Sequence, residues 1–513
     1  MNIVSMNLPS FLQNPIIYEI NTWIWLHEMS DKYRQEITLA NIPADEWDDL
    51  ANQGFTAVWL MGVWERSPAG LVIAEQHPGI MKDLREALPD LKDVDITGSP
   101  YCIRDYAADS KIGGTRGLSI ARQELTNRGL GLILDFVPNH VAPDHEWTIS
   151  NPGFFICGAE EDMINHPDDW CRAGKNIYAR ARDPFYPPWP DVLQLNIFDE
   201  GLRSTMVDTL KAIASQCDGI RCDMAMLVMN DIFHKTWTEK AGRKPEKEFW
   251  ASAIREVKQQ FPGFTFIAES YWDTEPDLIN LGFDFCYDKR YYDYLQESAQ
   301  KSMQHLNKMM PVQEKLLRFL ENHDEQRAAH LFSISRHKAI ALAALTLPGA
   351  RLLHDGQLEG RTVKVPVFLS RRINELKNQE LKEFYRKLLK ILQSDAIRNG
   401  KWTVCKVSGW SDNQSCQNLL VWEWLGNHEN ILFVVNLSDQ PAQALVGSSH
   451  SYIPGRTYQL FDVISGDLFY RDSDEMNNQG LFVGLQAWGA HAFIIPTQSP
   501  MLSQAEHSSL LPG

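Results

Sequence analysis

Eight short apolar runs, separated by longer segments with helical periodicity, are the feature of this chain that most restricts its fold. Such alternation is typical of βα units arranged around a parallel sheet. Eight units are the number found in a (β/α)8 TIM barrel, whose catalytic groups lie at the C-terminal ends of the strands. The sequence therefore predicts an α/β protein with a TIM barrel over residues 1–395 and strands at residues 16–20, 57–61, 131–137, 219–223, 264–269, 283–287, 316–320 and 350–354.

The segments between these runs carry apolar residues three or four positions apart, which places one apolar stripe of a helix against a sheet. The pattern recurs at Leu118, Ala121 and Leu125, at Leu202, Met206, Leu210 and Ile213, at Phe249, Trp250, Ile254 and Val257, and at Leu381, Phe384, Leu388 and Leu392.

Two regions depart from this rhythm. Residues 141–195 are rich in Pro, Gly, Asn and aromatic residues and are too long for an ordinary βα loop, so they predict a small inserted segment after the third strand, at the barrel mouth. Residues 400–496 contain apolar runs separated by Gly, Asn and Ser, which predicts an all-β C-terminal domain, an antiparallel β-sandwich. The tail, 497–513, is predicted to be disordered.

Charge and composition argue against several classes of partner. The formal net charge is −17 and no basic run is present, which speaks against nucleic acid and an anionic membrane surface. The sequence shows neither a signal-peptide pattern nor a run of about 18 apolar residues, so a cytoplasmic protein is expected. The 8 cysteines form no CxxC pair, which favours reduced thiols over disulfides or a zinc site. The oligomeric state cannot be inferred from these features.

The fourth run ends in the sequence GIRCD, residues 219–223, with a guanidinium two positions before a carboxylate. Side chains two apart in a strand share a face, so Arg221 and Asp223 should point the same way. A permanent positive charge at this distance is expected to keep Asp223 ionised. An ionised carboxylate is what a carboxylate nucleophile requires.

Polar residues also end the third, fifth and seventh runs. One carboxylate after an apolar run can simply cap a helix, but three with polar companions predict a shared site. Glu269 follows an apolar run without an adjacent cation and is expected to hold its proton. One ionised and one protonated carboxyl group, about 5 to 5.5 Å apart, are the requirement for retaining glycoside cleavage. The strand-end residues are Asp135, Asn139 and His140, then Glu269, and then Glu321, Asn322, His323 and Asp324.

In this order and on these strands, the four stretches resemble the short motifs of the α-amylase superfamily, glycoside hydrolase family 13. The matching pattern is Gly-x-Arg-x-Asp after one strand, Glu after the next, and Asn-His-Asp two strands later. YCIRDY at 101–106 and QLN at 194–196 add to the resemblance, which spans roughly residues 15–496 and does not assign a subfamily.

The resemblance implies a role for each matching residue. Asp223 would be the nucleophile, Glu269 the general acid and base, and Asp324 the carboxylate that stabilises the transition state. The residues that would bind substrate are Arg221, His140, His323 and Tyr101, and those that would support the loops near the site are Asp135 and Asn139.

No cofactor is expected, although many relatives bind calcium near the position of Asn139. The acidic residues close by, at 144 and 160–162, do not have the spacing of an EF-hand loop. A second difference follows the nucleophile, where starch-degrading relatives carry a Lys-His pair and this chain has MAMLVM at 224–229. This run is interpreted as an apolar wall of the site, which argues against ordinary starch hydrolysis.

The expected function is that of a retaining glycosidase or transglycosidase acting on α-glucosidic bonds of an α-glucan, an oligosaccharide or a small α-glucoside. A phosphate-using glucosyl or maltosyl transferase is an alternative, for which Arg327 is the one cationic pointer. A catalytically silent glycan-binding or scaffold relative is a further alternative, but such a protein would be expected to lack one or more of the three carboxylates.

Overall fold

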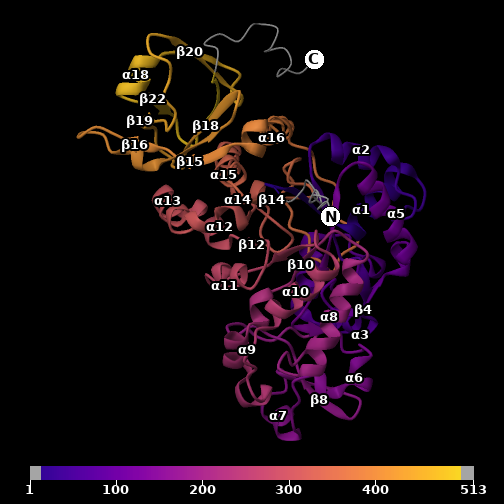
Figure 1. The fold of residues 1–513 in the computed structure, drawn as a ribbon. Coiled ribbons are helices and arrows are strands. Elements are labelled where there is room, and N and C mark those ends of the chain that lie inside the picture. Colours follow the sequence, from indigo (N-terminus) through magenta and orange to yellow (C-terminus); the bar gives the residue numbers. More distant parts are fainter. Residues whose placement is uncertain (1–12, 498–513) are drawn as a thin grey trace, which may run out of the picture.

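The computed structural model describes residues 13–497, and the eight predicted runs form one closed barrel (Figure 1). Neighbouring strands are parallel throughout, and the last closes against the first. The predicted α/β barrel is thereby confirmed. Around the barrel the strands are β1 (Ile16–Asn21), β2 (Ala57–Met61), β5 (Gly131–Phe136), β10 (Gly219–Cys222), β11 (Thr265–Ala268), β12 (Phe285–Tyr287), β13 (Leu316–Arg318) and β14 (Ala350–His354).

Helices follow each barrel strand, and their apolar stripes are buried as the periodicity predicts. Leu118, Ala121 and Leu125 of α5, for example, belong to the same core cluster as Leu132 and Leu134 of β5. The helices are α1 (Thr22–Tyr33), α2 (Ala44–Asn52), α5 (Gly114–Asn127), α8 (Glu200–Ala214), α9 (Asn230–Trp237), α10 (Phe249–Gln260), α11 (Glu275–Asn280), α12 (Lys289–Glu297), α13 (Ala299–Lys308), α14 (Ala328–Leu331), α15 (Ile334–Leu345), α16 (Gln379–Leu392) and α17 (Asp395–Asn399).

The segment between β5 and α8 contains two small antiparallel pairs. In Figure 1 its elements α7 and β8 lie at the end of the molecule opposite to the C-terminal strands. Pairing of β6 with β9 brings its two ends together, so the segment returns to the barrel mouth where it began. Its elements are β6 (His140–Val141), α6 (Trp147–Ser150), α7 (Glu160–Asn165), β7 (Trp170–Ala173), β8 (Asn176–Ala179) and β9 (Leu193–Gln194).

A second elaboration, which the sequence analysis did not anticipate, lies between β2 and α5. It holds β3 (Trp64–Arg66), α3 (Pro68–Gln76), α4 (Pro78–Ala87) and β4 (Ile103–Ala108). Leu84 and Ile96 of this segment pack against Leu369, which follows β14, in a separate apolar cluster. Arg371 joins the same two segments through ion pairs with Asp90 and Asp95. Two loops of the barrel mouth are thus fixed to each other.

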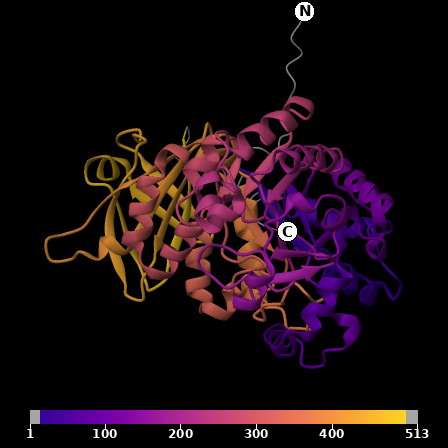
Figure 2. The ribbon, with the colours of Figure 1, turned by 90° about the horizontal axis from the view of Figure 1, so that it is seen from below.

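The C-terminal residues form two antiparallel sheets that share a core, as predicted for a β-sandwich. Strand alternation divides β17 between two cores, because Trp422 and Trp424 face the barrel while Val421 faces the second sheet. Both indoles bond Thr346 at the end of α15, which attaches the sandwich to the barrel. Figure 2 shows the C-terminal strands beside the barrel. One sheet contains β15 (Lys401–Val404), β17 (Leu419–Leu425), β18 (Glu429–Asn436), β23 (Ala490–Pro496), β20 (Thr457–Asp462) and β21 (Leu468–Asp472), the other contains β16 (Lys406–Ser408), β19 (Ala442–Gly447) and β22 (Leu481–Leu485), and α18 (Ser473–Asn478) lies beside them.

No helix within residues 13–497 is both long enough and apolar enough to cross a membrane. All 8 cysteines lie in this range and all are free, which agrees with the expectation of reduced thiols. Of the tail predicted to be disordered, residues 498–513 lie outside the described part of the chain.

Candidate active site

Two of the predicted catalytic carboxylates follow neighbouring strands of the barrel. Asp223 comes directly after β10 and Glu269 directly after β11. The amide of Asp223 donates to the carbonyl of Phe136 at 2.8 Å, and the amide of Glu269 donates to that of Cys222 at 3.0 Å. The barrel hydrogen bonds therefore continue up to both residues and fix where their side chains begin.

Arg221 connects these carboxylates below the mouth of the barrel. Its Nη1 lies 2.8 Å from Oδ1 of Asp223, as the shared strand face predicts, and 3.5 Å from Oδ1 of Asp135. Its Nη2 lies 2.7 Å from Oε2 of Glu269. The expectation that Glu269 lacks a neighbouring cation is therefore wrong: one guanidinium, 1% exposed, serves both carboxylates.

Burial opposes the ionisation expected for Asp223. Desolvation, together with the charges on Glu269 and Asp324, raises the pKa of Asp223 to about 8 against the lowering effect of Arg221. Arg221 therefore contacts Asp223 as the sequence predicts, but its charge does not outweigh burial and the neighbouring carboxylates. An acid and a nucleophile require one protonated and one ionised carboxyl group.

Both oxygens of Glu269 have further donors. The hydroxyl of Tyr271 donates to Oε1 at 2.9 Å, and the backbone amide of Met224 donates to Oε2 at 2.7 Å. Met224 has a φ of 41°, a conformation that costs free energy for a residue other than glycine. Strained backbone directly after Asp223 thus places its amide on the carboxylate of the neighbouring strand.

The interpretation of residues 224–229 as an apolar wall holds only for Met224, which lines the cavity. The residues that follow it form a short 3-10 helix, Ala225–Val228, whose side chains are all buried in the main core. Their apolar character therefore serves packing of the barrel rather than contact with a ligand.

Asp324 is oriented by a histidine that is itself held between two carboxylates. Nε2 of His323 lies 3.0 Å from Oδ2 of Asp324, and its Nδ1 lies 2.5 Å from Oε1 of Glu19. Despite the lowering effect of burial, these two charges raise the pKa of His323 to about 10. Although burial acts in the opposite direction, His323 in turn holds the pKa of Asp324 well below its usual range. Oδ1 of Asn322 accepts the amides of Asp324 and Glu325, each at 2.9 Å, and so shapes this turn.

His140 and Tyr101 lie beside the carboxylates. Burial lowers the pKa of His140 to about 3, so its ring is neutral, and Trp189 lies against it with ring centroids 5.3 Å apart. The ring of Tyr101 stacks on His323, and its hydroxyl lies 2.7 Å from Nε2 of that residue.

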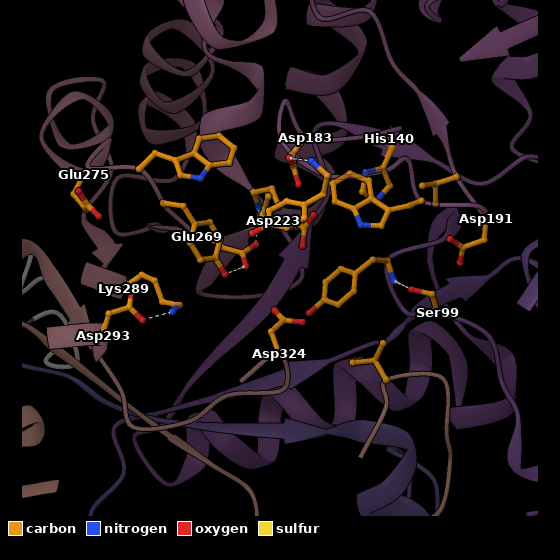
Figure 3. Close-up of a pocket in the computed structure, with 18 of the residues that line it drawn as sticks. Ser99, His140, Asp183, Asp191, Asp223, Glu269, Glu275, Lys289, Asp293 and Asp324 are labelled. Atoms are coloured by element: carbon orange, nitrogen blue, oxygen red, sulfur yellow. Dashed lines mark hydrogen bonds and ion pairs between the residues drawn. The ribbon is translucent and has the colours of Figure 1, made fainter. Parts of the chain in front are cut away.

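These side chains line one cavity of about 600 Å³ (Figure 3). Figure 3 shows Asp223 and Asp324 in its middle, Glu275, Lys289 and Asp293 beyond Glu269 on one side, and His140, Ser99 and Asp191 on the other. Of the predicted site residues, those that line the cavity are Asp223, Glu269, Asp324, His140 and Tyr101, whereas Arg221, His323 and Asp135 lie buried directly behind them.

Asn139 does not reach the cavity and is engaged with a neighbouring side chain. Its Oδ1 and its carbonyl both accept from the amide of Gln194, each at 2.9 Å. A bonded amide nitrogen at this oxygen does not suit a calcium ligand set. The acidic candidates nearby are paired as well, Asp144 with Ser67 and Asp162 with Lys240. Within residues 13–497, no group of three or more His, Cys, Asp or Glu residues could hold a metal ion.

Several cavity residues were not anticipated from the sequence. Tyr271 and Trp272 come two and three residues after Glu269, so their positions in the sequence could have predicted that they line the cavity. Trp189, Asp183 and Asp191 come from the segment 141–195, in which the sequence indicated a wall but no individual residue. No sequence motif marked the positively charged residues of α12, Lys289 and Arg290. The unanticipated lining residues are Ser99, Asp183, Tyr186, Trp189, Asp191, Val192, Tyr271, Trp272, Asp273, Glu275, Lys289, Arg290, Asp293, Val367 and Phe368.

Comparison with solved structures places this fold among amylases. A noncanonic maltogenic α-amylase, AmyB from Thermotoga neapolitana, superposes with a TM-score of 0.66 at 19% identity, covering 94% of this chain and 99% of that one. A debranching enzyme from Nostoc punctiforme superposes with a TM-score of 0.61 at 16% identity, covering 95% and 99%. At such identities the likeness concerns the fold.

Sequence relatives and a family model give the classification. The α-amylase MalA of Haloarcula japonica is 24% identical over 362 residues, 69% of this chain and 45% of the relative, so the chain spans less than half of that protein. α-Amylase 2 of Dictyoglomus thermophilum is 23% identical over 438 residues, covering 76% and 71%. The family model described as alpha amylase, catalytic domain, matches residues 44–423, well over half of the sequence. The chain belongs to the α-amylase family.

Proposed function

We propose that this protein is a retaining glycosidase or transglycosidase that cleaves α-glucosidic bonds of an oligosaccharide or a small α-glucoside. The observation that carries the proposal is the pair of carboxylates after neighbouring strands, Asp223 and Glu269, which share the guanidinium of Arg221 and line one cavity with Asp324. One ionised carboxyl group and one protonated carboxyl group are what a double displacement requires.

In the first step, a carboxylate oxygen of Asp223 attacks the anomeric carbon while Glu269 gives its proton to the glycosidic oxygen. The bond between carbon and leaving oxygen breaks, and the sugar becomes an ester of Asp223. Glu269 then takes a proton from water or from a sugar hydroxyl, whose oxygen attacks the same carbon and frees Asp223. Asp324, kept ionised by His323, is placed to stabilise positive charge that develops on the ring and to hold sugar hydroxyls.

The alternative of a phosphate-using transferase finds little support in this geometry. Arg327, the residue that suggested it, is 2% exposed and bonds Glu321 and the carbonyl of Asp355, away from the cavity. The cations that line the cavity are also paired, Lys289 with Asp293 and Arg290 with Asp273. A free phosphate would have to compete with these carboxylates. A silent relative is disfavoured because the three carboxylates meet in one cavity.

The decisive experiment follows the covalent intermediate. An activated α-glucosyl fluoride with a second fluorine on the ring slows the breakdown of a glycosyl-enzyme. Incubation should add one glycosyl unit to a peptide that contains Asp223, and the variant Asp223→Asn should acquire none. NMR of the first product from a natural substrate should show the starting anomer. Inversion of configuration, or labelling of another residue, would refute the proposal.

A matched control is Asp208→Asn on α8, a carboxylate that is 76% exposed and does not line the cavity. It should retain full turnover. Assays with and without phosphate address the transferase: turnover that requires phosphate and releases a sugar phosphate would support the alternative.

A further inference from the structure

Two loops on different sides of the cavity meet through an aromatic contact. Phe185 belongs to the segment between β8 and β9, and Trp272 belongs to the loop between β11 and α11. Their ring centroids are 4.9 Å apart with an angle of 76° between the planes, an edge-to-face arrangement. Phe185 is 60% exposed, so this pair is a surface contact and not part of the core.

The loop that carries Phe185 is stiff. Four prolines stand within seven residues, at positions 184, 187, 188 and 190, and each fixes a backbone dihedral angle. Oδ1 of Asp183 accepts the amides of Phe185 and Tyr186 at 2.6 and 3.0 Å. The amide of Trp189 donates to the carbonyl of Ala181 at 2.8 Å, which closes the turn. Phe185 is therefore held in place and does not simply rest against Trp272.

The partner loop is also constrained. Trp272 and Asp273 both have positive φ, 62° and 59°, an unfavourable conformation for two consecutive residues that are not glycine. Arg290 of α12 contacts the carboxylate of Asp273 at 3.1 Å and fixes the loop at this point. The energetic cost of this backbone has to be offset by the position it gives to the Trp272 ring.

The contact adjoins the cavity through Trp272, which lines it, while Phe185 itself does not. Trp272 is three residues after Glu269, and both line the cavity. In Figure 3, Glu275, Lys289 and Asp293 lie beyond Glu269, on the side opposite to His140. From the other loop Tyr186, next to Phe185, lines the same cavity. The two aromatic residues thus connect the walls of the cavity next to the residue proposed to protonate the leaving oxygen.

We propose that the Phe185–Trp272 contact is the specificity determinant that limits the leaving group to a short sugar and directs the enzyme to short oligosaccharides instead of internal bonds of long α-glucans. The inference rests on the proposed glycosidase function. A cavity of about 600 Å³ has the size that encloses a small ligand, whereas a long glucan needs a groove that is open at both ends. Stiff loops make the restriction permanent, because neither can withdraw without losing its supporting bonds.

The test compares the specificity constant, kcat/KM, for amylose with that for maltotriose. The wild-type ratio should be low, and Phe185→Ala should raise it by about tenfold or more, since the substitution removes a steric exclusion. Trp272→Ala should raise the ratio likewise, and the double variant should add little, because either single change already opens the contact. Phe185→Tyr retains the ring edge and should keep the wild-type ratio.

Tyr470→Ala serves as the control, since this exposed aromatic residue on β21 is remote from the cavity residues in the sequence and belongs to the sandwich. Unchanged melting temperatures would show that the variants fold. An unchanged ratio in folded Phe185→Ala and Trp272→Ala overturns the inference while leaving the proposed function intact. Absence of any cleavage of maltotriose and other α-glucosides by the wild type, in contrast, would overturn the proposed function itself.

Discussion

The hydroxyl of Tyr271 donates a hydrogen bond to Oε1 of Glu269 at 2.9 Å, whereas Arg221 and the amide of Met224 contact the other oxygen, Oε2. Glu269 is 2% exposed, so its orientation depends on these three partners. Tyr271 lines the cavity and follows Glu269 by two residues. We assign it as a positioning residue for the proposed general acid.

Tyr271→Phe should therefore affect proton transfer more than binding. We expect kcat to fall by about tenfold for a substrate with a sugar leaving group, the scale of one lost hydrogen bond to a charged partner. An aryl glycoside with an acidic phenol needs less help and should lose less. Equal losses for both substrates would contradict the assignment.

The acid limb of the pH dependence of kcat/KM should lie near pH 8, because burial and the charges on Glu269 and Asp324 raise the pKa of Asp223 to about 8. The sign follows from the chemistry: the nucleophile attacks as a carboxylate, so activity rises as the pH rises through this pKa. Glu269→Gln removes one of the neighbouring charges and should move this limb to lower pH for a substrate with an acidic phenol as leaving group. Activity on sugar leaving groups should fall by about 10² to 10⁴. An acid limb that does not move in Glu269→Gln would contradict this account.

The barrel could be predicted because its strands are apolar runs and its helices have clear periodicity. The candidate carboxylates could be predicted because they follow those strands directly. The contact of Arg221 with Glu269 could not, since it joins neighbouring strands and depends on the register that pairs Arg221 with Ile267. From the local sequence, the guanidinium of Arg221 could be predicted to contact Asp223 but not Glu269.

The walls of the cavity depend on backbone conformations that leave no trace in composition. Trp272 and Asp273 have positive φ without glycine, so no residue type marked this turn. Phe185 meets Trp272 across 87 positions, and only the arrangement of two long loops brings them together. The elaboration at 62–108 was missed because its helices α3 and α4 pack mainly on a loop after β14 and not on the sheet.

Two substitutions of Arg221 should distinguish the effect of its positive charge from the effect of its planar shape. Arg221→Lys retains one positive charge but cannot contact two carboxylates with a planar fork, so kcat should fall by about a hundredfold with a small change in stability. Arg221→Met leaves three buried carboxylates without their cation, which should lower the free energy of unfolding by about 3 to 5 kcal/mol at pH 7. Urea unfolding at pH 7 and pH 5 measures this loss of stability relative to the wild type. The loss should be smaller at pH 5, because the carboxylates gain protons there. An equal loss at both pH values would argue against charge as its cause.

Calcium removal should have no effect on this protein. Asn139 presents its side-chain oxygen to the amide of Gln194 instead of to a cation. Treatment with EGTA should leave both the melting temperature and kcat unchanged, and added calcium should restore nothing. Asn139→Ala should cost about 0.5 to 1.5 kcal/mol in the free energy of unfolding, because it removes the side-chain acceptor of the buried Gln194 amide but leaves the backbone carbonyls of Asn139 and Leu195 to accept. A drop in melting temperature with EGTA that calcium reverses would show that a calcium site exists.

His323 should stabilise the fold as a cation, and the sign of its pH dependence can be worked out. Its pKa is raised to about 10 in the folded protein, from about 6.5 for an unperturbed histidine. The stabilisation is therefore fully present below pH 6.5 and is lost as the pH rises towards 10. His323→Gln should lower the free energy of unfolding at pH 7 by about 3 kcal/mol, since Glu19 is left buried without its partner. The difference in the free energy of unfolding between variant and wild type should narrow between pH 7 and pH 10, as measured by urea unfolding.

The charge on His323 also keeps Asp324 ionised. The same substitution should therefore reduce kcat at pH 7. A variant with normal kcat would show that His323 stabilises the fold without contributing to the proposed site.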